Sequence, residues 1–347
     1  MSEKRERQKV IVILGPTASG KTGAAVRLAA SLKGEIISCD SRQVYRGMDL
    51  GTGKDLEEYT LPSGEKIPYH LIDIADPNDT YNLAEFLRDC HKALALLREK
   101  NVPGILAGGS ALYLDGILRQ YQLKGGAPDE KFRQELWDTP TEKLQEKLRN
   151  LEPDSPILLR EKENRSRLIR RIEMLLLAPD SPLLEGTLGP EEGYDFFVTG
   201  IFRPREEIRS RIEIRLRQRL EMGMIEEISA LHKQGVPWEK LEFFGLEYRY
   251  IALYLQGKLS YEEMFTELLA KIRQFAKRQD SWFRYLERHN VPIYWFREGE
   301  EDLLCSMSRD FLAGKPLPEP SLRLSETFYG RRDTGSNNLQ KMESGNE

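Results

Sequence analysis

Residues 10–22 combine a short apolar run with residue types that can hold a phosphate. The β-branched run 10–14 leads directly into the pattern G-x-x-x-x-G-K-T. Glycines let the backbone curl so that N–H groups point inward, the following helix adds partial positive charge, and Lys21 adds a full charge. Thr22 would place its hydroxyl on a Mg²⁺ ion shared with phosphate oxygens. We therefore predict a strand, a helix over 24–32, and between them a phosphate site made by Gly15, Pro16, Thr17, Ala18, Ser19, Gly20, Lys21 and Thr22.

Asp40 is a candidate for proton transfer. Residues 35–38 have the pattern of a second strand, and Asp40 follows it closely. The carboxyl ends of parallel strands face the ligand crevice, so we expect Asp40 to lie beside the phosphate loop. It could act there as a general base or as a Mg²⁺ ligand. The alternative is a helix N-cap, a position where aspartate is common.

Strand and helix patterns alternate along the chain. An apolar run at 69–74 is followed by helical spacing over 81–100 and by a strand pattern at 103–107. This order predicts an α/β fold, a P-loop NTPase-like parallel sheet flanked by helices. The last of these strands leads to a Gly-Gly pair and Ser110, which could cap a helix or contact a ligand.

The pattern changes between residues 121 and 190, where no strand candidate occurs. We predict an all-helical insertion here, with helices over 129–138 and 141–151. A third predicted helix carries Arg160, Lys162, Arg165, Arg167, Arg170 and Arg171. Such a basic face could bind nucleic acid phosphates, although charge runs often form only a solvated helix surface.

The chain is thereby divided into a first core part at 1–120, the insertion at 121–190, a second core part at 191–316, and a polar tail at 317–347 that we expect to be disordered. The second core part contains basic amphipathic helices over 206–222 and 264–288 and a last strand over 291–296. Apolar residues at helical spacing are more often core, so we assign Phe275 and Phe283 there.

Composition excludes several classes. Charged residues make up 31% of the chain, the net charge is -4, and no apolar stretch is long enough to span a membrane. Residues 1–9 are polar rather than a signal peptide, so we expect a cytoplasmic protein without membrane contact. The three cysteines show no C-x-x-C spacing, which argues against zinc sites and disulfides. We expect a monomer.

Several motifs occur together and in order. They are Gly-Pro-Thr-Ala-Ser-Gly-Lys-Thr at 15–22, Asp-Ser-Arg-Gln-Val-Tyr-Arg-Gly-Met-Asp-Leu-Gly-Thr at 40–52, His-Leu-Ile-Asp at 70–73, Gly-Gly-Ser-Ala-Leu-Tyr at 108–113 and Arg-Gln-Phe-Ala-Lys-Arg-Gln at 273–279. This set resembles tRNA dimethylallyltransferases. The resemblance implies transfer of a dimethylallyl group from dimethylallyl diphosphate to the exocyclic amine of the adenosine just 3′ of the anticodon, with Mg²⁺ as cofactor.

The resemblance also implies residue roles. Asp40 would take the proton of the amine, Lys21 and Thr22 would neutralise the departing diphosphate, and Arg215 would lie near it, with Arg278 as a second candidate. Contacts to tRNA would come from Asp40, Ser41, Arg42, Gln43, Ser110, Ser166, Arg167 and Arg170. Two departures from the family pattern are Ser110, where threonine is commoner, and residues 244–249, which replace the usual Gly-Tyr-Arg segment.

Three alternatives share part of this pattern. An adenylate isopentenyltransferase has the same loop and chemistry but would not need the basic insertion. A P-loop kinase using ATP would explain the α/β pattern but not the 40–52 block. A non-catalytic RNA-binding module would not require Lys21, Thr22 and Asp40 together.

Overall fold

The computed structural model describes residues 7–121, 129–177 and 193–326. Contacts within the chain divide it into two compact units. The larger unit comprises Gln8–Leu114 and Tyr194–Glu347, and the smaller unit comprises Met1–Arg7 and Asp115–Gly193.

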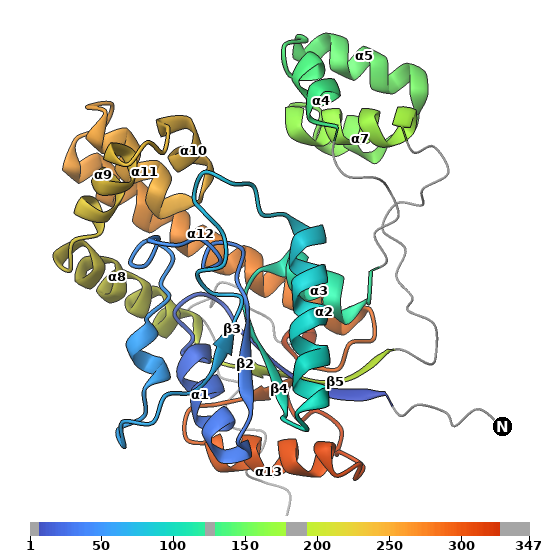
Figure 1. Cartoon of the computed structure of the whole chain (residues 1–347), viewed down its shortest axis with the longest axis vertical. Coiled ribbons are helices and arrows are strands. Elements are labelled where there is room, and N and C mark those ends of the chain that lie inside the picture. The colour runs from blue at the N-terminus through green and yellow to red at the C-terminus, as the bar shows by residue number, and fades with distance from the viewer. Residues whose placement is uncertain (1–6, 122–128, 178–192, 327–347) are drawn as a thin grey trace, which may run out of the picture. The chain divides into compact units, whose positions relative to one another are not determined.

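The larger unit is built on a parallel sheet, which confirms the predicted α/β fold class (Figure 1). Among the described residues the sheet has six strands in the order β3-β2-β4-β1-β5-β6. The strands are β1 (Gln8–Leu14), β2 (Glu35–Cys39), β3 (Tyr69–His70), β4 (Gly104–Gly108), β5 (Tyr194–Ile201) and β6 (Tyr294–Phe296).

The register brings the candidate loops to one edge of the sheet. β1 lies between β4 and β5, and Leu14 pairs with Gly108 and Gly200 at its carboxyl end. Cys39 of β2 pairs with the same Gly108. The residues that follow β1, β2 and β4 therefore emerge side by side, as the rule for the crevice of a parallel sheet requires.

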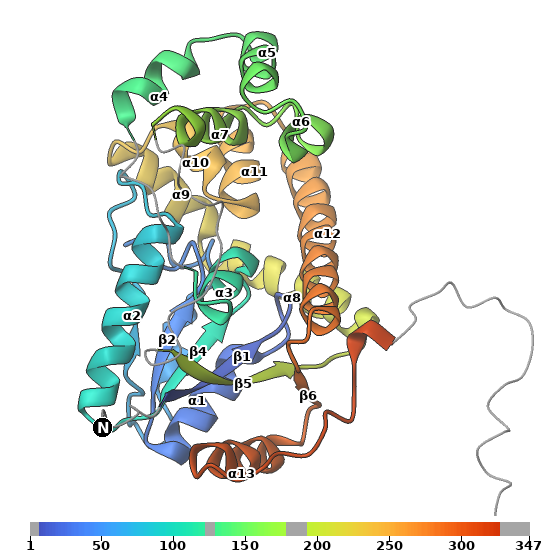
Figure 2. The same cartoon turned by 90° about the vertical axis from the view of Figure 1, so that its right-hand side faces the viewer.

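Helices cover both faces of this sheet, as Figure 2 shows. On one face, α1 (Lys21–Leu32) packs with α13 (Glu301–Leu312) over buried β1 residues such as Ile11 and Ile13. On the other, α2 (Leu83–Glu99) buries Leu94 and Leu97 beside Gly104 of β4. The Asn82 side chain and Glu85 form a capping box that starts α2. α3 (Ala111–Leu118) follows β4 directly.

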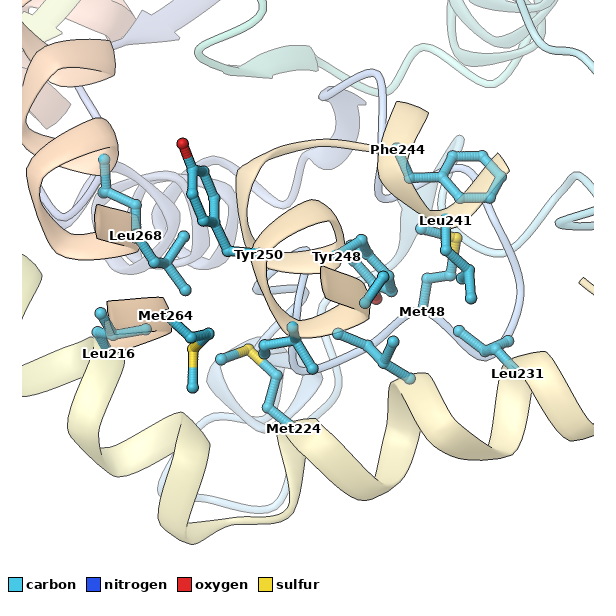
Figure 3. Packing of buried hydrophobic residues seen from close by; sticks show 14 of the residues in the cluster. Met48, Leu216, Met224, Leu231, Leu241, Phe244, Tyr248, Tyr250, Met264 and Leu268 are labelled. Atoms are coloured by element: carbon cyan, nitrogen blue, oxygen red, sulfur yellow. The ribbon is translucent and has the colours of Figure 1, made fainter. Parts of the chain in front are cut away.

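A second core lies among five helices beyond the carboxyl edge of the sheet. Figure 3 shows part of this core, in which Met224, Leu241, Tyr248 and Leu268, each from a different helix, belong to one buried cluster. Met48, from the loop after β2, inserts into the same cluster and is fully buried. The loop that carries Asp40 is thus anchored to the helical layer, which consists of α8 (Arg205–Glu221), α9 (Met224–Lys233), α10 (Trp238–Phe243), α11 (Leu246–Leu255) and α12 (Tyr261–Arg288).

The regular elements in the described part of the smaller unit are helices, joined by turns. Its core joins Leu144, Leu148, Leu168 and Ile172. The prediction of one basic helix that carries both Arg160 and Arg171 is wrong, because residues 161–164 separate two helices. The Asn164 side chain accepts a hydrogen bond from the backbone N–H of Arg167 at 3.3 Å, as residues that start a new helix do. The helices are α4 (Glu130–Trp137), α5 (Thr141–Leu151), α6 (Pro156–Arg160) and α7 (Arg165–Leu177).

Glu173 of α7 holds the smaller unit together through charge. Its side chain is buried and accepts hydrogen bonds from Arg133 Nη2 at 2.7 Å, Arg170 Nη1 at 2.6 Å and the backbone N–H of Asp129 at 2.9 Å. Burial raises the pKa of Glu173, but the hydrogen bonds from Arg133 and Arg170 outweigh it and leave that pKa below its usual value. The carboxylate therefore stays charged and pairs with both guanidinium groups.

Glu173→Gln should destabilise the smaller unit by about 2 kcal/mol, because it removes the charge-assisted hydrogen bonds that the buried carboxylate accepts from Arg133 and Arg170. Hydrogen exchange followed by mass spectrometry would report faster exchange in α5 and α7. The matched control is Glu163→Gln, which changes an exposed glutamate of the same unit. Equal exchange in the two variants would contradict this role of Glu173.

The described residues test three further predictions made from the sequence. Phe283 is fully buried as predicted, but the assignment of Phe275 to the core is wrong, since its ring is 38% exposed. The prediction of disorder over 317–347 is wrong for residues 324–326, because they form the short helix η2 (Leu324–Glu326), in which Leu324 is buried. Residues 327–347 lie outside the described residues. No helix in the described part of the chain has the length and apolar character needed to cross a membrane.

Candidate functional site

The phosphate loop joins β1 to α1 and is tightly curled. Ala18 and Gly20 adopt positive φ angles of 62° and 88°, and the backbone N–H of Ser19 donates to Pro16 O at 3.2 Å. Lys21 begins α1, and its Nζ lies 3.5 Å from Pro16 O. Burial and the neighbouring positive charge of Arg215 lower the pKa of Lys21 to about 8, although Asp40 and Glu58 act in the opposite direction. An arriving anion would relieve this electrostatic cost.

Gln279 connects the phosphate loop to the end of β4. The backbone N–H of Thr17 donates to Gln279 Oε1 at 2.8 Å, and Gln279 Nε2 donates to Gly109 O at 2.9 Å. The side chain comes from α12 and is 5% exposed. We did not predict this role, although Gln279 ends the Arg-Gln-Phe-Ala-Lys-Arg-Gln motif.

A cavity of about 260 Å³ opens where the loops after β1, β2 and β4 meet. We call it the crevice cavity. It brings together residues that the sequence analysis assigned to phosphate binding, proton transfer and tRNA contact, and Phe275 also lines it. Those residues include Lys21, Thr22, Asp40, Ser41, Arg42, Gln43 and Ser110.

Asp40 caps a turn and also lines this cavity. Its Oδ1 accepts hydrogen bonds from the backbone N–H groups of Arg42 at 2.8 Å and Gln43 at 3.4 Å. The helix N-cap alternative is wrong, because residues 41–44 form a turn and no helix starts there; a place beside the cavity is what a general base or a Mg²⁺ ligand would need. The turn fixes the direction in which the carboxylate faces the cavity.

The neighbouring polar residues hold the loop after β2, residues 40–54, in place, and we call this segment the crevice loop. The backbone N–H of Ser41 donates to Ser110 Oγ at 3.0 Å. Gln43 Oε1 accepts from Ser38 Oγ at 2.9 Å, and Gln43 Nε2 donates to Gly53 O at 3.0 Å. Ser110 thus ties the end of β4 to the loop after β2.

One wall of the crevice cavity comes from residues 244–248, which lie in the segment that departs from the family pattern. Tyr248 donates its hydroxyl to Glu227 Oε1 at 2.6 Å. The same Glu227 carboxylate accepts from the backbone N–H groups of residues 49–51 at 2.7–3.1 Å. Glu247 also lines the cavity, and burial raises the pKa of its carboxyl group. The divergent segment is therefore part of the site.

Lys54 lies at the carboxyl end of the crevice loop and holds it in place through hydrogen bonds and ion pairs. Its ammonium group is fully buried and donates to Tyr45 O at 2.8 Å and to Asp49 Oδ1 at 2.6 Å. It also pairs with Asp73. The lysine thereby joins the loop to the His-Leu-Ile-Asp segment at 70–73.

Lys54→Met should lower the free energy of unfolding by about 2 kcal/mol, because it removes charge-assisted hydrogen bonds that the buried carbonyl of Tyr45 cannot replace. Urea denaturation of the full chain would measure the change. Lys66→Met alters an exposed lysine nearby and should leave stability unchanged. A Lys54 variant as stable as the Lys66 variant would contradict the expectation.

A second cavity, of about 410 Å³, lies on the other side of Lys21 and Thr22. We call it the arginine cavity. Arg215 and Arg219 line both cavities. The other polar residues that line the arginine cavity include Asp55, Glu58, Arg211 and Gln218.

Asp55 pairs with both shared arginines. Arg219 Nη2 lies 3.0 Å from Asp55 Oδ2, and Arg215 Nη2 donates to the same oxygen. Burial raises the pKa of Asp55, but the charges of Arg219 and Arg215 outweigh it and hold that pKa below its usual value. Arg215 was predicted from the sequence to lie at this site, but Asp55 and Arg219 were not.

Arg278 does not join this group. Its guanidinium is exposed and lies 6.0 Å from the centre of the Phe275 ring. Among the described residues, those that line the two cavities do not include Arg278. Its place near the phosphate site stays a prediction, although Phe275, over which its guanidinium lies, lines the crevice cavity.

The remaining predicted tRNA contacts lie in the smaller unit. Arg167 pairs with Glu161, and Arg170 pairs with Glu173 at 2.6 Å. The two arginine side chains are still 59% and 42% exposed. Ser166 borders a shallow hollow beside Leu159. These side chains combine a structural role with an accessible basic surface.

Comparison with known proteins agrees with this arrangement. The family model described as IPP transferase matches residues 43–286, and the one described as isopentenyl transferase matches residues 8–67. The chain is 44% identical to tRNA dimethylallyltransferase 1 of Syntrophus aciditrophicus over 297 residues, covering 85% of this chain and 95% of that protein. It is 46% identical to tRNA dimethylallyltransferase 1 of Geotalea uraniireducens over 299 residues, covering 85% and 94%.

Solved structures are similar as well. A tRNA isopentenylpyrophosphate transferase from Bacillus halodurans is 32% identical, with a TM-score of 0.62, over 89% of this chain and 96% of that chain. A eukaryotic dimethylallyltransferase that acts on tRNA has a TM-score of 0.75 at 22% identity, over 90% of this chain and 81% of that one, a likeness that concerns the fold alone. From the matched family model and these relatives, we conclude that the chain belongs to the IPP transferase family.

Proposed function

We propose that this protein is a tRNA prenyltransferase. It transfers a dimethylallyl group from dimethylallyl diphosphate to the exocyclic amine of the adenosine 3′-adjacent to the anticodon and releases diphosphate. The observation that carries this proposal is that Lys21, Thr22 and Asp40, from two separate loops, line one cavity. The relatives described above are named for this activity.

The proposed reaction is a single displacement. The amine nitrogen bonds to the allylic carbon, the bond from that carbon to the diphosphate oxygen breaks, and the amine proton moves to Asp40. Lys21, Arg215 and the phosphate-loop N–H groups neutralise the charge that develops on the departing diphosphate. These groups bind the transition state more strongly than the substrate, which lowers the barrier.

Mg²⁺ fits the residues that surround the proposed diphosphate. The Thr22 hydroxyl lines both cavities, with Asp40 in one and Glu58 in the other, and Mg²⁺ prefers such oxygen ligands. The described residues contain no group of three acidic, histidine or cysteine side chains able to hold a metal alone. Thr22 would hold the ion together with diphosphate oxygens, and the bound ion would supply further neutralising charge.

We propose that tRNA contacts both units. Ser41, Arg42, Gln43 and Ser110 would contact the target nucleotide, which must leave its stack to enter the crevice cavity. Ser166, Arg167 and Arg170 would contact backbone phosphates. In this scheme residues 121–190 are a tRNA-binding insertion in a core formed by 1–120 and 191–316, and the protein acts as a cytoplasmic monomer.

An anticodon stem-loop RNA tests the proposed acceptor atom. The adenosine at the target position should become prenylated, and a stem-loop with purine riboside there should not, since purine riboside lacks the exocyclic amine. Nuclease digestion and mass spectrometry would identify the product nucleoside. Prenylation of the purine riboside stem-loop would contradict the proposal.

A further inference from the structure

Asp55 pairs with the two arginines that line both cavities. It lines the arginine cavity, and its carboxylate binds Arg215 and Arg219, the two arginines shared with the crevice cavity. Both oxygens lie within 3.1 Å of Arg219 Nη2. One carboxylate thus occupies the guanidinium groups that a diphosphate would need.

The positive charges around the arginine cavity explain why an anion is needed beside Arg215 and Arg219. Lys21, Arg211, Arg215 and Arg219 all line the arginine cavity, and its acidic lining residues are Asp55 and Glu58. Arg219 is only 9% exposed, so its charge is largely removed from water. A buried guanidinium without an anion is strongly destabilising. Asp55 supplies that anion directly to Arg215 and Arg219.

The backbone holds Asp55 close to the arginines. Its φ of 44° lies in the left-handed region, and the adjacent Lys54 is fastened by Asp49 and Asp73. Gly53 also has a positive φ, and a Cβ there would lie 2.0 Å from Arg219 Nη2. The loop therefore fits against the guanidinium of Arg219 only because residue 53 has no side chain.

We propose that Asp55 is a positioning residue that acts as an internal substitute for diphosphate on Arg215 and Arg219. A bound diphosphate must displace it from these arginines, and Asp55 returns to them when diphosphate leaves. It therefore competes with diphosphate binding and promotes product release. This inference rests on the proposed function, because that function supplies the diphosphate.

Asp55→Asn removes the competing charge while keeping the shape and the left-handed conformation, which asparagine tolerates well. Inorganic pyrophosphate with Mg²⁺ should bind this variant about tenfold more tightly than the wild type, a typical coupling between two interacting sites. Isothermal titration calorimetry on the full chain would measure both dissociation constants. Steady-state turnover should fall more than the single-turnover rate, since release of diphosphate becomes slower.

The matched control is Glu213→Gln. Glu213 also bridges two arginines, accepting from Arg217 and Arg273 at 2.9 Å, but it does not line either cavity. Its replacement should leave pyrophosphate affinity unchanged. Equal or weaker pyrophosphate binding by Asp55→Asn would overturn the inference, since it would mean that Asp55 orients the arginines for the ligand. Wild-type protein that does not bind pyrophosphate at all would overturn the proposed function as well.

Hydrogen exchange in the wild-type protein tests the inference even if the Asp55→Asn variant does not fold. Competition predicts that pyrophosphate speeds hydrogen exchange at residues 56–59, because Asp55 loses its partners. Slower exchange there on pyrophosphate binding would contradict competition.

Discussion

Asp40→Asn should lower the rate of prenyl transfer by about 10² or more and leave tRNA affinity nearly intact, as loss of a general base does. The amide retains an Oδ1 that can accept from the N–H groups of Arg42 and Gln43, so the turn should persist. What is lost is the ability to take the proton. Single-turnover transfer and tRNA binding should be measured on the same preparation.

Asp76→Asn is the matched control for this substitution. Asp76 Oδ1 accepts from the backbone N–H of Asn78 at 2.8 Å, so it caps a similar turn, but it does not line the crevice cavity. This variant should transfer at the wild-type rate. If Asp40→Asn reduced affinity and turnover in parallel, Asp40 would be a residue that positions tRNA and not the base.

Lys21→Met should lower the single-turnover rate by about 10² to 10³, the loss typical of removing one preorganised group that stabilises developing negative charge. The ammonium lies at the start of α1, against the curled phosphate loop, where burial strengthens its interaction with an anion. Methionine keeps the length of the side chain and removes the charge. Rapid-quench transfer at saturating dimethylallyl diphosphate would measure the rate.

Lys33→Met changes an exposed lysine at the opposite end of the same helix and serves as its control. It should leave the rate unchanged. A Lys21 variant that needs more dimethylallyl diphosphate but reaches the wild-type rate at saturation would contradict a role in the transition state. Such a result would assign Lys21 to substrate binding alone.

Local patterns explain what could be predicted from the sequence. The strand, loop and helix around Lys21 follow from a contiguous pattern of residue types, and Asp40 could be placed by the rule that parallel strands end at one edge. Both features depend on neighbours in the chain. The structure accordingly has Lys21 and Asp40 lining the same cavity.

Long-range contacts explain what could not be predicted. Asp55 meets Arg219 across 164 residues, and no local pattern records that pairing. The helical repeat of α12 predicts which of its faces are polar and which are apolar, but it does not predict which residues line a cavity. Phe275 lines the crevice cavity, Phe283 is fully buried, and Arg278 stays exposed.

Prenyl transfer from radiolabelled dimethylallyl diphosphate with Mg²⁺, offered to unmodified tRNA and to AMP in parallel reactions, tests the central claim most directly. We expect label in tRNA, at the single adenosine beside the anticodon, and none in AMP. Label in AMP and not in tRNA would contradict the account and make the protein a small-molecule prenyltransferase. No label in either acceptor would contradict prenyl transfer itself.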